Sequence, residues 1–470
     1  MQLNLALAYS KQKKAPEIKS TTMNDSDLPF VTVQLPVYNE LYVIERLLES
    51  VAKLDYPKEK LEIQLLDDST DESFEIATKK VEELKGLGLN IYQVKRPERK
   101  GYKAGALAFG MKEIKGEFIA IFDADFIPDP KFLKKTIPHF YHSKEVGVVQ
   151  TRWQHLNKNY SLLTRLQAFA LDAHFTVEQV GRNTLGHFIN FNGTAGVWRK
   201  SCIEDAGGWQ SDTITEDLDL SYRAQMKGWK FVYLEDVLSP AELPAEMNSL
   251  KSQQFRWTKG AAECAVKNLP KVLKDKNIDL KTKFHACFHL LNSFVFICIF
   301  STAILSVPVL LIKHNFDGYD SIFKLASVFV TSFIILSYFY WLSSSSNEKT
   351  GFKSFLTFVY RFPLFLSVSM GLSLHNSIAV VEGYMGKKTP FVRTPKFALN
   401  EKSGTWVNKK YRALKINTLT VVEILFTLYF LAAIGYAFYL EDYGLMPFHI
   451  MLALGFGIVS FYSVKHSQMT

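Results

Sequence analysis

Cysteine is scarce in this sequence, and the few cysteines are not spaced as a metal site or a disulfide framework. Four occur in 470 residues and none forms a Cys-x-x-Cys pair; they are Cys202, Cys264, Cys287 and Cys298. This spacing argues against the common zinc-binding and thiol-redox motifs. We predict that all four are reduced and unpaired, as is usual in a protein that faces the cytosol.

Long apolar runs are also missing from the first 280 residues. Short apolar runs alternate there with charged residues, as in a soluble domain, whereas apolar stretches of about 20 residues or more appear from Phe284 onward. The whole-chain hydrophobic content of 48% therefore averages a soluble part and a membrane part. The N-terminal run MQLNLALAYSKQKK is too short to cross a bilayer and lacks a cleavage-site pattern. We interpret residues 1–28 as the stub of a membrane helix or as a surface anchor.

A nucleic-acid-recognition motif is absent although the chain is basic. The formal net charge is +9, and its basic residues gather beside the apolar segments. Lysine and arginine in that position mark the cytoplasmic side of a membrane protein. We therefore expect a lipid bilayer as a partner, and no nucleic acid.

Residues 29–280 alternate between strand-like and helix-like segments. The strand-like segments PFVTVQLPVYNE, LEIQLLDDSTD, NIYQVKR and FIAIFDADF are separated by the helix-like segments VIERLLESVAKL, SFEIATKKVEELKGLG and KAGALAFGMKEI. This alternation predicts an α/β domain whose parallel sheet is covered on both faces. Ligands bind such sheets beyond the carboxyl ends of the strands, where the acidic pairs Asp67-Asp68 and Asp123/Asp125 both lie.

Residues 281–470 are predicted to be helical and membrane-embedded. The apolar segments are 284–312, 322–343, 355–381, 418–440 and 443–465, and the connector 382–417 is rich in lysine and arginine. Positive charge places the connector and the N-terminal domain in the cytosol. Since the chain has already returned to the cytosol after the second segment, we expect 355–381 to lie in the interface or re-enter, which leaves four crossing helices.

Two acidic motifs at strand ends are candidate ligand sites. The Asp-Ala-Asp motif at 123–125 offers two carboxylates that can flank one Mg²⁺ or Mn²⁺, an ion that usually keeps waters and takes phosphate oxygens. The alternative is a solvated turn. Asp67 or Asp68 could accept a hydrogen bond from a nucleobase edge, or the same acidic stretch could simply cap the following helix.

A second pair of motifs combines a lysine with two acids. Lys103 in GYKAGAL lies at a helix start, where a diphosphate would bind well, unless it is an ordinary surface lysine. Glu216 and Asp217 enter a helix, where acids also favour the N-terminus by themselves, with Thr215 as the cap. The chemical interpretation makes Asp217 a general base that takes the proton of a sugar hydroxyl.

The stretch SQQFRWTKG places a cation and a large aromatic side by side shortly before the apolar region. Arg256 can bond a leaving diphosphate in fork geometry, Trp257 can stack on a sugar ring, and Gln253 adds a donor. The alternative is an interfacial tryptophan with a snorkelling arginine beside a membrane helix.

Taken in order, the motifs DDS, DAD, TED and QxxRW, followed by membrane helices, resemble the processive family 2 glycosyltransferases: cellulose, chitin, hyaluronan and mannan synthases. The resemblance covers nearly the whole chain, and the segments LLDDSTD, GYKAGAL, IFDADF and FNGTAGVWR are most like the plant cellulose synthase-like A and C groups. It implies a GT-A fold and inverting transfer of a hexose from GDP-mannose or UDP-glucose to a growing β-linked mannan, glucomannan or glucan. Passage of that polymer through the membrane is also implied.

The resemblance implies a role for each motif. Asp217, with Glu216, matches the catalytic base, and Asp123 and Asp125 match the positions that hold Mg²⁺ or Mn²⁺ and the donor. The other implied donor contacts are Tyr38, Glu40, Asp67, Asp68, Lys103, Gln253 and Arg256. The implied acceptor contacts are Trp257 and, in the FNGTAGVWR loop, Phe191, Asn192, Gly193 and Thr194.

The FVRTPK segment within the connector resembles the gating loop of cellulose synthases, which has the pattern FxVTxK. Phe391, Thr394 and Lys396 match that pattern, whereas Arg393 replaces the valine, so we expect loop closure to differ. Membrane glycosyltransferases that make a single glycolipid share most of these motifs and are the alternative. A transporter or scaffold with a degenerate catalytic domain is a third interpretation, against which the intact acids and the Arg-Trp pair argue. The implied location is the inner or plasma membrane, with the catalytic domain in the cytosol.

Overall fold

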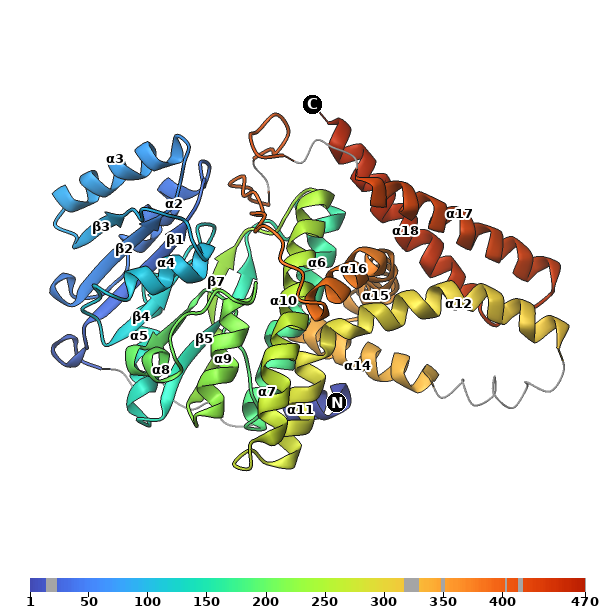
Figure 1. Ribbon diagram of the computed structural model, residues 1–470, viewed down its shortest axis with the longest axis horizontal. Helices are drawn as coiled ribbons and strands as arrows, with labels where there is room; N and C mark the ends of the chain where they lie inside the picture. Colours follow the sequence, from blue (N-terminus) through green and yellow to red (C-terminus); the bar gives the residue numbers. More distant parts are fainter. Residues whose placement is uncertain (14–22, 317–328, 348–350, 402–403, 413–416, 470) are drawn as a thin grey trace.

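A seven-stranded sheet forms the centre of the N-terminal half of the chain (Figure 1). The computed structural model describes residues 1–13, 23–316, 329–347, 351–401, 404–412 and 417–469. The strands lie in the order β3-β2-β1-β4-β6-β5-β7. Their bounds are β1 (Val31–Val37), β2 (Leu61–Asp67), β3 (Ile91–Val94), β4 (Phe118–Ile121), β5 (Val146–His155), β6 (Gly196–Arg199) and β7 (Lys230–Ala241).

The sheet is parallel only in part. Strands β1 to β4 pair in parallel, as predicted, but β6 runs antiparallel to both β4 and β5. The predicted parallel pairing therefore holds for β1 to β4, and β5 also pairs in parallel with β7, but the sheet is antiparallel at β6. The reason is that the chain enters β6 from residues 191–195, which lie at the carboxyl end of β4, so β6 must run in the opposite direction.

Apolar residues cover the sheet on both faces, as the alternation predicted. Along β4, Phe118 and Ala120 pack into one buried cluster, while Ile119 and Ile121 pack into another. Successive side chains of a strand point to opposite faces, so a run of four buried residues fits a central strand. The covering helices are α2 (Ile44–Val51), α3 (Ser73–Gly86), α4 (Tyr102–Gly110), α5 (Phe132–Thr136), α8 (Lys200–Asp205) and α9 (Glu216–Met226).

The first helix, α1 (Gln2–Gln12), packs onto the domain that contains the sheet. Leu5 and Tyr9 are buried in the cluster that also covers β4, and the Tyr9 hydroxyl donates to Glu235 at 2.9 Å. A Cβ on Gly181 would lie 2.8 Å from the carbonyl of Leu5, so α7 (Gln179–Thr184) meets α1 backbone to backbone. This helix is thus part of the folded body, and its role as a membrane anchor stays a prediction.

Long helices form the C-terminal part and extend away from the sheet (Figure 1). Within the described ranges, four helical stretches are long and apolar enough to cross a membrane: Asn292–Asn315, Phe352–Gly371, Thr418–Tyr439 and Met446–Gln468. The other helices among the described residues of this part are α11 (Leu280–Leu290), α14 (Phe329–Asn347) and α16 (Ser373–Tyr384).

The four candidate spans include one segment that was expected not to cross the membrane, and they leave out one that was expected to cross it. The expected non-crossing segment 355–381 splits at Leu372 into α15 (Phe352–Gly371), which meets the length and hydropathy of a span, and α16. Its non-crossing placement is therefore not confirmed. The expected span 322–343 corresponds to α14, whose described residues are not long and apolar enough together to count as a membrane span. Residues 322–328 lie outside the described part.

Two glycines allow close contacts of the C-terminal helices with one another and with α10. A Cβ on Gly455 would lie 1.9 Å from the Ser367 carbonyl, so α15 and α18 (Met446–Gln468) cross at a small residue, as membrane helices often do. A Cβ on Gly383 would lie 2.7 Å from the carbonyl of Lys259, which brings α16 against α10 (Met247–Lys274). All four cysteines are free, as predicted.

Candidate active site

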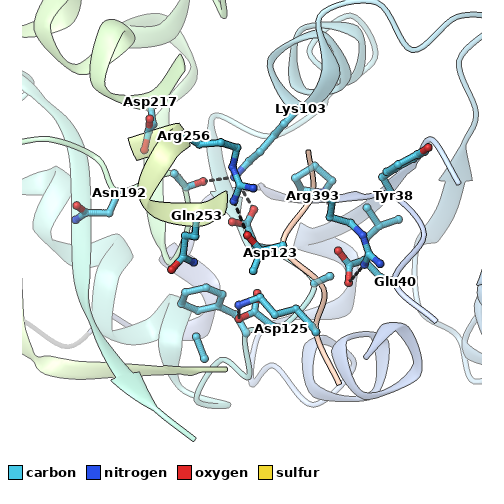
Figure 2. A pocket seen from close by; sticks show the side chains of 18 of the residues that line it. Tyr38, Glu40, Lys103, Asp123, Asp125, Asn192, Asp217, Gln253, Arg256 and Arg393 are labelled. Atoms are coloured by element: carbon cyan, nitrogen blue, oxygen red, sulfur yellow. Dashed lines mark hydrogen bonds and ion pairs between the residues drawn. The ribbon is translucent and has the colours of Figure 1, made fainter. Parts of the chain in front are cut away.

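The carboxyl end of β4 opens into a pocket bounded by the sheet, α9, α10 and the segment after α16. The structure brings most of the residues singled out in the sequence into this one place (Figure 2). Its lining includes Tyr38, Glu40, Asp68, Lys103, Asp123, Asp125, Asn192, Gly193, Glu216, Asp217, Gln253, Arg256, Trp257, Phe391, Thr394 and Lys396.

Asp123 lies two residues after the end of β4 and is held from two sides. Its backbone N–H donates to the Thr194 hydroxyl at 2.8 Å, and its Oδ1 accepts from Lys103 Nζ at 2.5 Å. Lys103 also donates to the carbonyl of Gly193 at 2.9 Å. Burial lowers the pKa of Lys103, but the surrounding carboxylates, Asp123 first, outweigh it and raise the pKa. Lys103 is therefore a fixed cation in the pocket and not a surface lysine.

Asp125 is more deeply placed and is paired with a second lysine. Its Oδ2 accepts from Lys396 Nζ at 2.8 Å and from the backbone N–H of Glu242 at 3.0 Å. Both carboxylates of the Asp-Ala-Asp motif thus face an ammonium group, and neither belongs to a freely solvated turn.

Glu216 and Asp217 begin α9, and both are half-buried in the pocket wall. The hydroxyl of Thr215 makes no capping bond. Burial raises the pKa of Asp217 to about 6 and that of Glu216 to about 7, against the lowering effect of Lys103. These values suit proton transfer near neutral pH.

The glycine of the FNGT loop allows that loop to approach Asp217. Gly193 has φ +80, and a Cβ there would lie 3.1 Å from Asp217 Oδ2 and 3.5 Å from Lys103 Nζ. A side chain at this position would be strained and would fill the space beside the carboxylate. The loop therefore forms the wall next to the candidate base.

Arg256 and Trp257 project from the long helix α10 into different surroundings. Arg256 donates to the carbonyl of Val392 and, at 2.8 Å, to the hydroxyl of Thr394. Trp257 and Gln253 line the pocket and also an adjoining apolar hollow. Side chains of α6 (Leu162–Ala173), α10, α15 and α16 surround that hollow, so Trp257 stands at the border between the catalytic domain and the helices.

The FVRTPK segment lies across the pocket and pairs with the candidate donor-binding groups. Arg393 forms an ion pair with Glu40 at 2.7 Å (Figure 2) and lies over the ring of Tyr411 at 4.5 Å. Phe391 contacts the ring of Tyr102, with centroids 5.5 Å apart. Burial raises the pKa of Glu40 to about 7, although Arg393 acts in the opposite direction. The arginine that departs from the cellulose synthase pattern is thus the partner of an acid in the pocket.

Three residues that were predicted to contact substrates do not line the pocket. Asp67 is 1% exposed, and its carboxylate is used by Ser69 and Gln93, so only its neighbour Asp68 faces the pocket. Phe191 and Thr194 are 0% exposed. Phe191 packs on Trp198 with ring centroids 5.4 Å apart, and Thr194 supports the Asp123 backbone. Of the four loop residues, only Asn192 and Gly193 line the pocket, and their contact with an acceptor stays a prediction.

Other residues of the site were not foreseen. Arg96 donates through Nε to Asp68 Oδ1 at 2.9 Å, and Arg99 lies 3.4 Å from the ring centroid of Tyr38. The basic run KRPERK before GYKAGAL was a signal for both. Glu242 had no signal, because a lone acid at the end of β7 is not distinctive; its carboxylate accepts from the backbone N–H groups of residues 397 and 399 at 2.8 and 3.0 Å and so anchors the segment.

Comparison with known proteins places this chain in a family. The model of a family described as "Glycosyltransferase like family 2" matches residues 29–260. Glucomannan 4-beta-mannosyltransferase 1 of Oryza sativa subsp. japonica is 36% identical over 421 residues, which cover 86% of this chain and 76% of the relative. The chain belongs to glycosyltransferase family 2. Within it, the chain falls in the group of hexosyltransferases that includes the glucomannan 4-β-mannosyltransferases.

Two further similar proteins show how much of the chain the similarity covers. Glucomannan 4-beta-mannosyltransferase 7 of Arabidopsis thaliana is 39% identical over 66% of this chain and 59% of its own length. A mannosyltransferase from Pyrobaculum calidifontis, solved with GDP-mannose and Mn²⁺, covers 83% of this chain and 100% of its own, with a TM-score of 0.55 at 18% identity. The catalytic domain of this family 2 enzyme therefore has the predicted GT-A-type fold.

Proposed function

We propose that this enzyme lengthens a β-linked mannan or glucomannan from GDP-mannose, with UDP-glucose as the alternative donor. The observation that carries the proposal is the convergence of Asp123, Asp217, Arg256 and Trp257 on one pocket beside the helical part. The names of the relatives at 36–39% identity supply the sugar and the linkage. Product size separates a polymer from the alternative, a single glycolipid.

The proposed reaction is an inverting displacement at the anomeric carbon of the donor hexose. Asp217 takes the proton of the acceptor hydroxyl, whose oxygen bonds to the anomeric carbon from the side opposite the diphosphate. The bond between that carbon and the phosphate oxygen breaks, and the nucleoside diphosphate leaves with the electron pair. Arg256 and Lys103 supply positive charge to the leaving group.

Asp123 and Asp125 fit a divalent cation when the donor is bound. Among the described residues no group of three or more His, Cys, Asp or Glu side chains could hold a metal alone. Mg²⁺ and Mn²⁺ commonly need only one or two carboxylates when substrate phosphates complete the shell, and these two carboxylates line the same pocket. Such an ion would neutralise charge on the leaving diphosphate.

The FVRTPK segment must change partners when the donor enters. Arg256 cannot give both its terminal nitrogens to a diphosphate while they bond Val392 and Thr394. The donor therefore competes with the segment for this arginine. Residues 391–396 would thus act as a gate, because they hold Arg256 until the donor displaces them.

In this proposal Trp257 receives the acceptor. It faces both the pocket and the hollow between α6, α10, α15 and α16, and an indole face stacks well against the C–H face of a sugar. A growing chain would leave the pocket past Trp257 toward the helices and cross the membrane among them. The basic connector contacts the catalytic domain, for instance through Lys396 and Asp125, so both lie on one side of the bilayer, the cytosolic side by the positive-inside rule.

The test uses the purified full chain in detergent with labelled GDP-mannose or UDP-glucose, Mg²⁺ or Mn²⁺, and a short mannan oligosaccharide. We expect a ladder of products from GDP-mannose that an endo-β-1,4-mannanase degrades, and no ladder from the Asp217→Asn enzyme. A single product that extracts into organic solvent would instead show glycolipid synthesis and refute the proposal.

A further inference from the structure

A π-helical turn interrupts the long helix that runs beside the pocket. α6 continues into five π-helical residues, His174–Glu178, and then into α7. Such single π turns are rare and are often found at functional sites. Here the turn presents His174 to the FNGT loop: His174 Nε2 lies 3.2 Å from Asn192 Oδ1.

The hydrogen bonds around Asn192 fix which way its amide points. Its Oδ1 accepts from Asn190 Nδ2 at 2.8 Å as well as from His174 Nε2, and its backbone N–H donates to Gln150 Oε1 at 3.0 Å. An amide oxygen that accepts two hydrogen bonds leaves the amide nitrogen on the opposite side. Donation from Nε2 requires a hydrogen on that nitrogen, and the contact of Nδ1 with the Glu178 carboxylate requires one there as well, so in this network His174 is doubly protonated and donates on both sides. In that form of His174 the network selects one of the two amide orientations.

The amide nitrogen so directed has no partner within the described structure. Asn192 Nδ2 is buried and makes no hydrogen bond, although the residue lines the pocket. A buried unpaired donor is unfavourable, so this N–H is suited to a ligand acceptor. Figure 2 shows Asn192 on the side of the pocket with Asp217 and Gln253, opposite Tyr38 and Glu40. The hydrogen-bond acceptor that fits this N–H is an oxygen of a sugar and not an oxygen of the nucleotide.

His174 is itself held in place from behind. Its Nδ1 lies 3.0 Å from Glu178 Oε2, one turn along the helix, and the other oxygen of Glu178 accepts from Arg182 at 3.0 Å. Arg182 is only 1% exposed. The imidazole is therefore fixed by a carboxylate that is anchored by a buried guanidinium, an arrangement that sets ring orientation.

We propose that His174 is a positioning residue that aims the Asn192 amide N–H at a hydroxyl or ring oxygen of the acceptor sugar next to Asp217. The inference deepens the proposed function and rests on it, since it presumes sugar transfer in this pocket. His174 acts through Asn192 and touches no reacting atom. It orients the acceptor and so contributes to the choice of sugar that can be extended.

The test compares His174→Ala, His174→Gln, Asn192→Ala and the double variant His174→Ala/Asn192→Ala in the purified full chain. His174→Ala should raise the acceptor KM about tenfold, as expected for one lost hydrogen bond that leaves its partner unpaired. The donor KM should stay unchanged. His174→Gln keeps a donor for Asn192 Oδ1 and should recover most of the loss. The double variant should be no worse than Asn192→Ala alone, because His174 acts only through Asn192.

The matched control is His187→Gln, a histidine bonded to Thr282 at 2.9 Å and absent from the pocket lining; it should leave the acceptor KM unchanged. Thermal unfolding of every variant reports folding, and His174→Gln keeps the test available if His174→Ala does not fold. Effects of His174→Ala and Asn192→Ala that multiply in the double variant would overturn the proposal. So would a rise in the donor KM equal to that in the acceptor KM, since this would assign the contact to the donor sugar or to general structure.

The measurement needs only an acceptor that the wild-type enzyme uses. If the wild type glycosylates a lipid and makes no polymer, the proposed function fails, but the same comparison of variants is run with that lipid acceptor. The two failures are therefore distinguishable.

Discussion

The ammonium group of Lys396 lies 2.8 Å from Asp125 Oδ2, so a residue of the FVRTPK segment occupies a carboxylate that a divalent cation would use. Asp123 is likewise paired with Lys103. A cation entering the empty pocket would have to displace or share these lysines. A cation that arrives with a diphosphate would find additional oxygen ligands and would compete better.

Metal binding is therefore expected to depend on nucleotide. Mn²⁺ should bind weakly to the enzyme alone and tighten at least tenfold with GDP or UDP, as measured by calorimetry or by the electron paramagnetic resonance signal of free Mn²⁺. Lys396→Met should strengthen binding without nucleotide, whereas the control Lys387→Met, which removes an exposed lysine paired with Glu382, should not. Equally tight binding with and without nucleotide would contradict this account, as would full turnover in excess chelator.

Replacing the candidate base should separate binding from chemistry. Asp217→Asn keeps the shape of the side chain but cannot accept the proton, so turnover should fall by roughly two to four orders of magnitude while donor affinity is retained. Thr215→Ala is the control on the same helix start, where the hydroxyl makes no capping bond, and should have a much smaller effect. A near-normal rate for Asp217→Asn would remove this residue from the role.

The dependence of the rate on pH follows from the same carboxylates. A general base works in its ionised form, so the rate should rise with pH through the raised pKa values, about 6 for Asp217 and about 7 for Glu216. Lys103 lowers the pKa of both. Lys103→Met should therefore move the acidic limb of the kcat–pH profile to higher pH. A limb that stays in place or moves to lower pH would show that these carboxylates do not control the rate.

Arg393 should hold the FVRTPK segment against the catalytic domain. Arg393→Val, which restores the residue of the cellulose synthase pattern, and Glu40→Gln both remove the 2.7 Å ion pair. In the absence of donor, either variant should speed chymotrypsin cleavage near Phe391, Phe397 and Tyr411 several-fold, and the double variant should add nothing. Unchanged cleavage in both single variants would show that this pair does not fasten the segment.

Features local in sequence were predictable, and features that depend on distant contacts were not. The alternation of strands and helices predicted β1 to β4 and the edge where Asp123 lies, because period and order are local properties. The antiparallel β6 follows from where the chain re-enters the sheet, which no period encodes. For the same reason the partner of Arg393 could not be read from sequence: Glu40 lies more than 350 positions away.

Single residues within a motif were harder to place than the motif itself. The FNGT loop lies at the pocket, yet Phe191 is buried in the core and only Asn192 and Gly193 of this loop line the pocket. Alternation along an extended segment sends neighbouring side chains in opposite directions, and the sequence does not say which one faces the ligand. The π turn that presents His174 left no recognisable pattern at all.

In the proposed mechanism, one pocket joins a donor diphosphate at Arg256 to an acceptor sugar at Trp257. Nucleotide release and sugar incorporation, measured together for Arg256→Ala and Trp257→Ala, separate these two roles. Arg256→Ala should lose both hydrolysis of the donor and polymer growth, because the leaving group is no longer stabilised. Trp257→Ala should continue to hydrolyse the donor while polymer growth stops, because only acceptor stacking is lost. Equal proportional loss of both activities in the two variants would contradict the division of roles, and polymer synthesis retained in both would show that the pair is only an interfacial anchor.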